Sequence, residues 1–310
     1  MDSLTAIERS KKKFPLKSRG TWHEIWKNRF IYLYISPFYI LFLVFGAFPI
    51  IYSFILSFNK WDGIGQMQYV GLSQYRALLQ DHDFWQSIAN TFIIWVESTI
   101  PMLFFALVIA FLLNAKDLAG REAYKTFYFL PNVTSIVAVA IIFGQIFGNY
   151  GIINFILTKL GLQPIQWRDV PHWVQVAISS MVFWRWVGYN AIIYLAGLQR
   201  IPTDLYEAAT VDGATKIQIF FKIVIPLLNP IILFTVITST IGGLQLFTEP
   251  QVFVGNSGGP NGGGMTIVLY LYNEAFVRNL YGYASAVAWA LAIIIFAFSA
   301  VNWFATKQLQ

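Results

Sequence analysis

Residues 204–226, DLYEAATVDGATKIQIFFKIVIP, form a polar and amphipathic stretch between two long apolar segments. Asp204 is a residue type that caps free backbone N–H groups, and Glu207 three positions later completes the pattern of a capping box. Gly213 can adopt the left-handed conformation that ends a helix, and a second amphipathic run starts at Thr215. The stretch therefore predicts a helix, a turn and a second helix.

The composition is that of an integral membrane protein. Hydrophobic residues make up 57% of the 310 residues and charged residues 12%, whereas about a quarter of the residues in soluble domains are charged. The basic residues behind the net charge of +6 sit in loops rather than on one folded face, so they do not indicate nucleic-acid binding. The chain has no cysteine and three scattered histidines, so we predict no disulfide and no metal site.

Six apolar segments are each near or above the roughly 20 residues that a bilayer requires. They cover approximately residues 30–58, 84–113, 126–147, 174–198, 224–248 and 282–305. The first segment is too long for a signal-peptide core and lacks a small-residue cleavage site, so it is expected to stay as a span. The sequence therefore predicts an all-α polytopic membrane protein, with a basic segment at 1–29 and a six-span domain at 30–310.

Lys and Arg are distributed unequally between the two sides of these spans. Fifteen lie in the N-terminal segment, the loops after spans two and four, and the C-terminus, against five in the other loops. Cytoplasmic loops are enriched in basic residues, so both termini and residues 204–226 are expected in the cytoplasm. Prolines inside the spans predict kinks, which fit static packing and a moving pore equally well. These are Pro49, Pro101, Pro131 and Pro230.

The spacing within 204–226 resembles a known signature. Glu207-Ala208-Ala209, then Gly213, then Ile223-Val224-Ile225-Pro226 is similar to the EAA loop in the permease subunits of binding-protein-dependent ABC importers. Ile225 departs from the leucine that the family usually has there, which is a nearly isosteric change. Upstream, Leu195-Ala196-Gly197-Leu198-Gln199 resembles the carbohydrate branch of the family.

This resemblance implies a function and a set of partners. It implies a permease subunit that moves a sugar or oligosaccharide across a prokaryotic plasma (inner) membrane, similar to the first permease of maltose-, oligosaccharide- and glycerol-phosphate-type systems. The implied partners are a second homologous permease, two cytoplasmic ATP-binding subunits and an external solute-binding protein. The residues implied to couple the ATPase subunits to the spans are Glu207, Ala208, Ala209, Asp212 and Gly213.

No catalytic motif is visible, so we predict that the chain is not an enzyme and binds no cofactor. Residues 255–264, GNSGGPNGGG, lack the Gly-Lys-Ser/Thr ending of a phosphate-binding loop and are expected to form a flexible external loop. From the residues alone, a secondary transporter or channel and a non-transporting scaffold stay open as alternatives. Within the importer interpretation, the alternatives are peptide, metal and glycerol-phosphate systems.

Aromatic and polar residues at mid-membrane depth are candidates for the sugar path. Sugars present apolar ring faces and hydrogen-bonding rims, and such side chains can contact both. The alternative is that these groups hold the helices together, as polar residues in membrane bundles usually do. The candidates are Trp184, Tyr189, Asn190, Gln145, Thr235 and Ser239.

Glu97 and Arg185 are ionisable residues of opposite sign within the spans. Glu97 lies thirteen residues beyond Phe84, and Arg185 lies eleven beyond Val174. At about 1.5 Å per residue, both are near the bilayer midplane. A lone charge there costs at least roughly 2.5 to 3.5 kcal/mol. We therefore predict that the two side chains meet, directly or through water, either to fix the packing of their spans or to bind the sugar.

Overall fold

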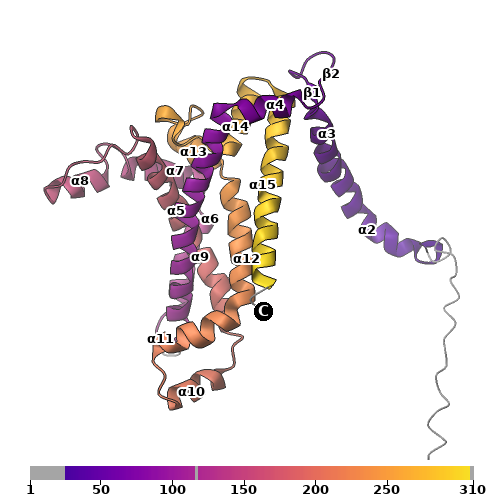
Figure 1. Ribbon diagram of the computed structural model, residues 1–310. Coiled ribbons are helices and arrows are strands. Elements are labelled where there is room, and N and C mark those ends of the chain that lie inside the picture. Colours follow the sequence, from indigo (N-terminus) through magenta and orange to yellow (C-terminus); the bar gives the residue numbers. More distant parts are fainter. Residues whose placement is uncertain (1–24, 116–117, 308–310) are drawn as a thin grey trace, which may run out of the picture. The chain divides into compact units, whose positions relative to one another are not determined.

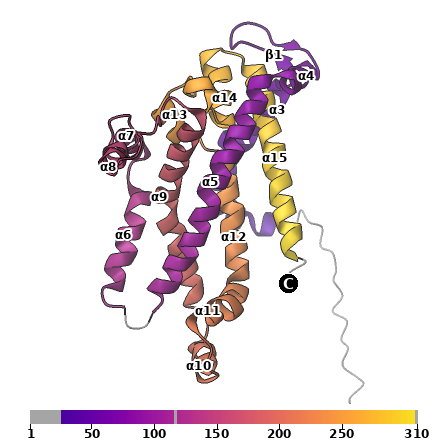
Figure 2. The same cartoon turned by 60° about the vertical axis from the view of Figure 1, so that its left-hand side comes forward.

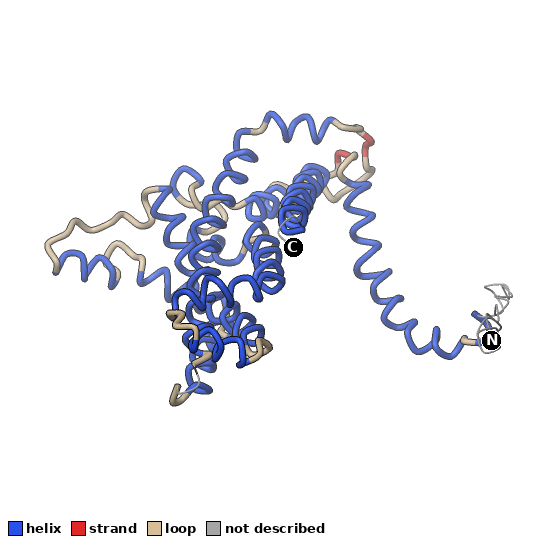
Figure 3. The backbone as a smooth tube through the Cα atoms, turned by 60° about the horizontal axis from the view of Figure 1, so that its bottom comes forward, coloured by secondary structure: helices blue, strands red, loops and turns tan. Residues whose placement is uncertain are grey.

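The computed structural model describes residues 25–115 and 118–307. The described chain is built of helices, with two short antiparallel strands, β1 (Asn59–Lys60) and β2 (Gln68–Tyr69) (Figure 3). This confirms the all-α prediction. The chain divides into two compact units, one ending at Ser53 and the other starting at Phe54. Most of the predicted basic segment, residues 1–24, lies outside the described residues.

The first unit holds most of one long apolar helix. This helix runs through α2 (Arg29–Phe42), the π-helical turn η1 (Leu43–Ala47) and α3 (Phe48–Leu56), whose last residues belong to the second unit. No side chain of α2 is buried. A helix with apolar side chains on every side is stable in hydrocarbon rather than in water, which agrees with the predicted first span.

Within the described residues, four helices are long and apolar enough to cross a membrane: Arg29–Leu56, His82–Leu113, Lys216–Leu244 and Tyr281–Phe304. The second is α5, and the fourth is the apolar part of α15 (Tyr281–Lys307). The third consists of α11 (Lys216–Ile219), the π-helical turn η2 (Phe220–Val224) and α12 (Ile225–Leu244). Helix α9 (Pro171–Leu198) has 28 residues but carries more polar side chains. The structure thus supports four spans of the six predicted. It supports five if two consecutive helices within residues 121–146, which meet at a sharp bend, are counted as one span.

That bent pair corrects the prediction of a continuous helix over residues 126–147. Helices α6 (Arg121–Val133) and α7 (Ile136–Ile146) meet at 94°. Thr134 between them is extended, with ψ 146°, so the helical hydrogen bonds stop there. Pro131 lies in the last turn of α6, just before the break rather than at a gentle kink. The last carbonyls of α6 consequently need partners from another helix.

The core of the second unit is centred on α5 and α9, which pack together over most of their length (Figure 1). Its largest buried cluster joins these helices to α12. Ala106, Ala110 and Ala191 are fully buried in that cluster. Small side chains allow membrane helices to approach closely, and close packing is the main force that joins them in lipid.

Shorter elements gather at one end of this bundle (Figure 1). Helix α4 (Ser73–Gln80) precedes α5, and α8 (Ile152–Lys159) lies between α7 and α9. The segment after α12 contains α13 (Thr248–Val254), the 3₁₀ turn η3 (Pro260–Gly262), α14 (Ile267–Tyr272) and the π-helical turn η4 (Asn273–Val277).

The glycine-rich segment 255–264 is not the loose loop that the sequence predicted. The Asn90 side-chain amide donates hydrogen bonds to the carbonyls of Gly262 (2.8 Å) and Met265 (3.1 Å). The Thr91 hydroxyl accepts one from the backbone N–H of Ile267 (2.9 Å). Since Asn90 and Thr91 lie on α5, the segment is fixed to the bundle. Gly262, with φ 65°, allows the tight turn that brings these carbonyls to Asn90.

A tyrosine–aspartate cluster fixes the neighbouring elements. The hydroxyls of Tyr270 and Tyr283 donate to one carboxylate oxygen of Asp81, at 2.6 and 2.7 Å. Its other oxygen accepts from the backbone N–H of Asp83 and Phe84, which caps α5. Partial burial acts to raise the pKa of Asp81, but these hydrogen bonds outweigh it and hold that pKa below its usual value.

Candidate functional site

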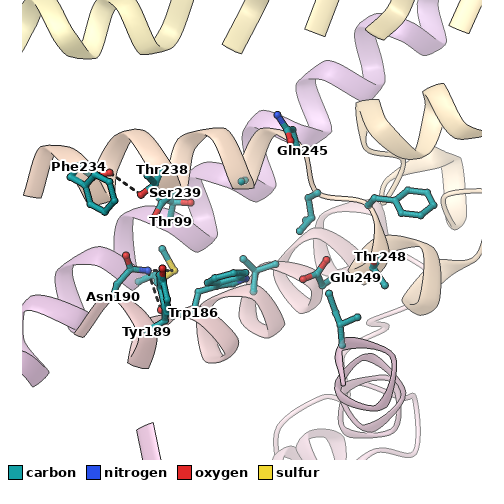
Figure 4. Close-up of a pocket in the computed structure, with 17 residues that line it drawn as sticks. Thr99, Trp186, Tyr189, Asn190, Phe234, Thr238, Ser239, Gln245, Thr248 and Glu249 are labelled. Atoms are coloured by element: carbon teal, nitrogen blue, oxygen red, sulfur yellow. Dashed lines mark hydrogen bonds between the residues drawn. The ribbon is translucent and has the colours of Figure 1, made fainter. Parts of the chain in front are cut away.

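A cavity of about 390 Å³ lies between α5, α9 and α12, with α13 at one end (Figure 4). Its volume is in the range of sites that hold small organic molecules. The Trp186 and Tyr189 rings stand edge to face with centroids 5.5 Å apart, and each is more than a third exposed. Further lining residues include Thr99, Asn190, Phe234, Thr238, Ser239, Gln245, Thr248 and Glu249.

Three of the six predicted path residues line this cavity. Tyr189 and Asn190 come from α9, and Ser239 comes from α12. Asn190 is buried, and its amide nitrogen donates to the carbonyl of Trp186 at 3.1 Å. Aromatic faces and hydrogen-bonding groups thus meet in one space, as the sequence argument required.

The other three predicted path residues lie elsewhere. Thr235 is fully buried, and its hydroxyl is 2.6 Å from that of Tyr194, so it joins α12 to α9. Trp184 packs against Phe143 of α7, with ring centroids 5.5 Å apart. Gln145 is exposed on α7 and does not line the cavity. Thr235 therefore fits the alternative of helix–helix contact.

Glu249 is a cavity residue that the sequence analysis missed. It lies in the first turn of α13 and is 4% exposed. Burial raises the pKa of its carboxyl group, while its own backbone N–H and the charge of Arg185 act in the opposite direction. A buried carboxyl group in a polar cavity is a candidate for binding hydroxyl groups. In the sequence, Glu249 lies in a segment expected to form an external loop, and no motif marks it.

The predicted contact between Glu97 and Arg185 is not present, and each side chain has other partners. The carboxylate of Glu97 accepts a hydrogen bond from the Ser179 hydroxyl (3.3 Å) and lies 3.9 Å from His172. The guanidinium of Arg185 donates to the carbonyls of Thr134 (3.2 Å) and Asn132 (3.4 Å). Among the described residues, no ion pair joins the two.

The reason is the direction of the side chains rather than their depth. Helices α5 and α9 are joined at pairs separated by 82, 85 and 88 residues, namely Glu97–Ser179, Asn90–Gln175 and Met102–Asn190. This parallel register puts Arg185 within about one helical turn of the level of Glu97. Arg185, however, faces the break between α6 and α7, where it satisfies carbonyls that the break leaves without a helical partner.

We expect Glu97→Gln and Arg185→Gln to lower the free energy of unfolding independently. Their effects should add in the double variant to within about 0.5 kcal/mol, because the two residues share no partner. Arg185→Gln should cost roughly 1.5 to 3 kcal/mol, since it removes charge-assisted hydrogen bonds from exposed carbonyls. Thermal unfolding of the three variants in detergent measures both values. A double variant that is more stable than Arg185→Gln alone would instead show that the two charges are coupled.

At the opposite end of the bundle from α13, the chain forms the predicted helix–turn–helix (Figure 2). Helix α10 (Thr203–Val211) is followed by Gly213, with φ 77°, and α11 begins at Lys216. Asp204 is not the cap that the sequence predicted, because Pro202 occupies the N-cap position and the helix starts two residues earlier. The capping box is formed instead at α11, by Thr215 and Gln218.

The predicted coupling residues lie on and just after α10. Glu207, Ala208, Asp212 and Gly213 are exposed, while Ala209 packs against the cluster of α5, α9 and α12. Val211 and Leu205 are also exposed, at 87% and 43%. The helix therefore contacts the bundle on one side and presents small and apolar side chains on the other.

Comparisons with known proteins give consistent matches. Residues 82–308 match a family described as binding-protein-dependent transport system inner membrane component. A lactose transport system permease protein of Rhizobium radiobacter is 38% identical over 280 residues, covering 89% of this chain and 94% of the relative. An arabinooligosaccharides transport system permease protein of Bacillus subtilis (strain 168) is 36% identical over 304 residues, covering 93% of this chain and 96% of the relative.

The fold is also found among solved structures. A chain from a bacterial alginate ABC transporter, crystallised with an alginate pentasaccharide-bound periplasmic protein, superposes with a TM-score of 0.81. The two are 24% identical, and the match covers 93% of this chain and 98% of that one. At this identity the match establishes the fold.

Proposed function

The chain belongs to the family of inner membrane components of binding-protein-dependent transport systems, and we infer that its cavity conducts a sugar or oligosaccharide. The observation that carries this inference is the convergence of Trp186, Tyr189, Asn190 and Ser239 on one space. Relatives named for lactose and arabinooligosaccharide transport support the same substrate class. Family membership also decides against the secondary transporter and the scaffold that the residues alone left open.

The energy for transport comes from other subunits, because permease subunits of this family are not enzymes themselves. The helix–turn–helix at α10 and α11 is the docking element for one of two ATP-binding subunits, with Glu207, Ala208, Ala209, Asp212 and Gly213 as the coupling residues, and the second permease docks the other subunit. Exposed Val211 and Leu205 support this assignment, since an apolar helix face fits a hydrophobic groove on a partner.

The remaining parts of the assembly follow from this assignment. The domain 30–310 crosses the membrane six times, and both termini are cytoplasmic. The six spans are the four long apolar helices, the bent pair of α6 and α7, and α9. The elements around α13 and α14 then lie outside, where a solute-binding protein delivers the sugar. A second homologous permease completes the pathway. The excess of Lys and Arg on the side of α10 supports this orientation.

The natural absence of cysteine allows a direct test of the cavity. In the complete transporter, Ser239→Cys in this chain is labelled with a water-soluble methanethiosulfonate, with and without lactose, arabinotriose or maltotriose. We expect a transported saccharide at about ten times its dissociation constant to slow labelling about tenfold, because it occupies the cavity.

A matched control is Gln163→Cys, at an exposed position in the 148–170 segment that does not line the cavity. Its labelling should not depend on the saccharide. If alanylalanine or glycerol 3-phosphate protects Ser239→Cys and none of the three saccharides does, the chain belongs to a peptide or glycerol-phosphate importer instead.

A further inference from the structure

Glu249 stands out among the cavity residues because no other side chain of the described residues bonds to its carboxylate. It is 4% exposed and lines the cavity, yet no hydrogen bond to its carboxylate from another side chain of the described residues is present, and no ion pair within 4 Å. Figure 4 places it beside Thr248 at the α13 end, with Asn190 and Ser239 toward the other end. Its electrostatic partners are its own backbone N–H and the charge of Arg185.

Burying a carboxyl group that no other side chain bonds to is costly, so such a group calls for an explanation. A second buried glutamate in the same outer segment shows the contrast, since Glu274 is 2% exposed but pairs with Arg278 at 2.9 Å. Arg185 does not pair with Glu249 in the same way: no ion pair within 4 Å joins them among the described residues, and the guanidinium donates instead to the carbonyls of Thr134 and Asn132. The carboxylate oxygens of Glu249 are therefore available to accept hydrogen bonds from a solute in the cavity.

We propose that Glu249 is a solute-binding residue that accepts hydrogen bonds from hydroxyl groups of the saccharide at the outer end of the cavity. This proposal rests on the proposed function, since it requires that the cavity holds a carbohydrate. A carboxylate can accept from two neighbouring hydroxyls at once, and adjacent hydroxyls are the repeating feature of sugar rings. Trp186, on the adjoining wall, offers an indole face to the ring itself.

The geometry also explains why this contact is selective. Hydrogen bonds to a charged group are stronger than those between neutral groups, and a low-dielectric cavity increases the difference. A solute without hydrogen-bond donors at this end leaves the carboxylate unpaired and is rejected, as buried polar groups generally reject ligands that cannot bond to them. Glu249 thereby favours polyhydroxylated solutes over apolar solutes of the same size.

The test measures solute affinity in the cavity itself. In the complete transporter carrying Ser239→Cys, the saccharide concentration that gives half protection from a methanethiosulfonate is compared with and without a second change. The probe is whichever of lactose, arabinotriose and maltotriose the parent transporter takes up. We expect Glu249→Ala to raise this concentration about tenfold or more, and Glu249→Gln to raise it by less, since the amide retains one acceptor.

Two further readouts separate binding from packing. Gln251→Ala is the matched control, because Gln251 lies on the same helix but outside the cavity and bonds to Asn256; half protection should not change. The rate of labelling without saccharide reports the position of α13, and it should be the same in the parent and in both Glu249 variants.

Each other result decides against the proposal. Unchanged half protection in Glu249→Ala and Glu249→Gln would overturn it while leaving the cavity assignment intact. A faster saccharide-free labelling rate with unchanged half protection would make Glu249 a packing residue of α13. Uptake of none of the three saccharides by the parent transporter would overturn the proposed function, and this inference with it.

Discussion

Gly188→Ala should cost about 3 kcal/mol or more of stability and strongly reduce the yield of folded protein. Gly188 lies on α9 at its contact with α6, where an added Cβ would come within 1.8 Å of the carbonyl oxygen of Tyr128 and 2.5 Å of its carbon. Both atoms belong to the backbone of α6, so no rotation of a side chain relieves the overlap. Overpacked contacts typically cost 1 to 3 kcal/mol, and backbone overlap belongs at the upper end.

The consequence reaches beyond the contact itself. Separating α6 from α9 also lengthens the hydrogen bonds of Arg185, which lies three residues before Gly188 and satisfies the carbonyls of Thr134 and Asn132. The break between α6 and α7 would lose its support. We therefore expect loss of transport in whatever fraction of Gly188→Ala still reaches the membrane.

The matched control is the same substitution at Gly242 in α12, where an added Cβ meets no atom within 4 Å. Gly242→Ala should leave stability within about 0.5 kcal/mol of the parent, or raise it slightly, because alanine restricts the unfolded chain. Thermal unfolding in detergent compares the two variants directly. Equal melting temperatures for both would show that α6 and α9 are not packed as closely as the structure has them.

The sequence predicted the helical class and the position of the turn between α10 and α11, but not which side chains share a face. Within α9, Val182, Trp186, Tyr189 and Asn190 follow helical spacing and line one cavity, whereas Trp184 is about half a turn away and packs against α7. That grouping is readable from a period of 3.6 residues. Which face of α9 lines a cavity depends on how α9 packs against helices that are distant in the sequence.

The break at Thr134 illustrates a second limit. A window average merges residues 126–147 into one apolar segment although Asn132, Thr134 and Ser135 interrupt it, so it does not detect the change of direction there. What stabilises the break is Arg185, 51 residues later in the chain. The same side chain was expected to pair with Glu97, because a count of residues gives depth along a helix but not the direction in which a side chain points.

Gly213→Val should abolish most transport while leaving the protein in the membrane. Gly213 has φ 77° and ends α10 in a Schellman motif, in which Gly213 N–H donates to the carbonyl of Thr210 (3.1 Å) and Ala214 N–H to that of Ala209 (2.9 Å). A β-branched residue in this conformation costs roughly 1 to 2 kcal/mol or more. An added Cβ meets no neighbouring atom within 4 Å, so the strain comes from the backbone conformation of the turn.

The expected result separates coupling from folding. A cost of this size changes the equilibrium constant between the native turn and other conformations by about five- to thirtyfold. The change displaces α10 relative to α11. The core of α5, α9 and α12 is unaffected. Saccharide-stimulated ATPase activity and uptake should therefore fall together, with normal membrane levels of the chain. The natural control is Gly213→Asn, because asparagine tolerates a positive φ; it should retain most of the transport that valine removes.

A double variant at Glu207 and Gly213 tests whether this helix–turn–helix couples the ATP-binding subunits to the spans. If the Glu207→Ala, Gly213→Val double variant assembles with the ATP-binding subunits and transports at the parent rate, the turn does not transmit their motion. If Gly213→Asn is as defective as Gly213→Val, the absence of a side chain, rather than the backbone conformation, is what the partner requires. We expect neither result. The turn at Gly213 is exposed and has room for a side chain, so only the positive φ angle restricts which residue can occupy that position.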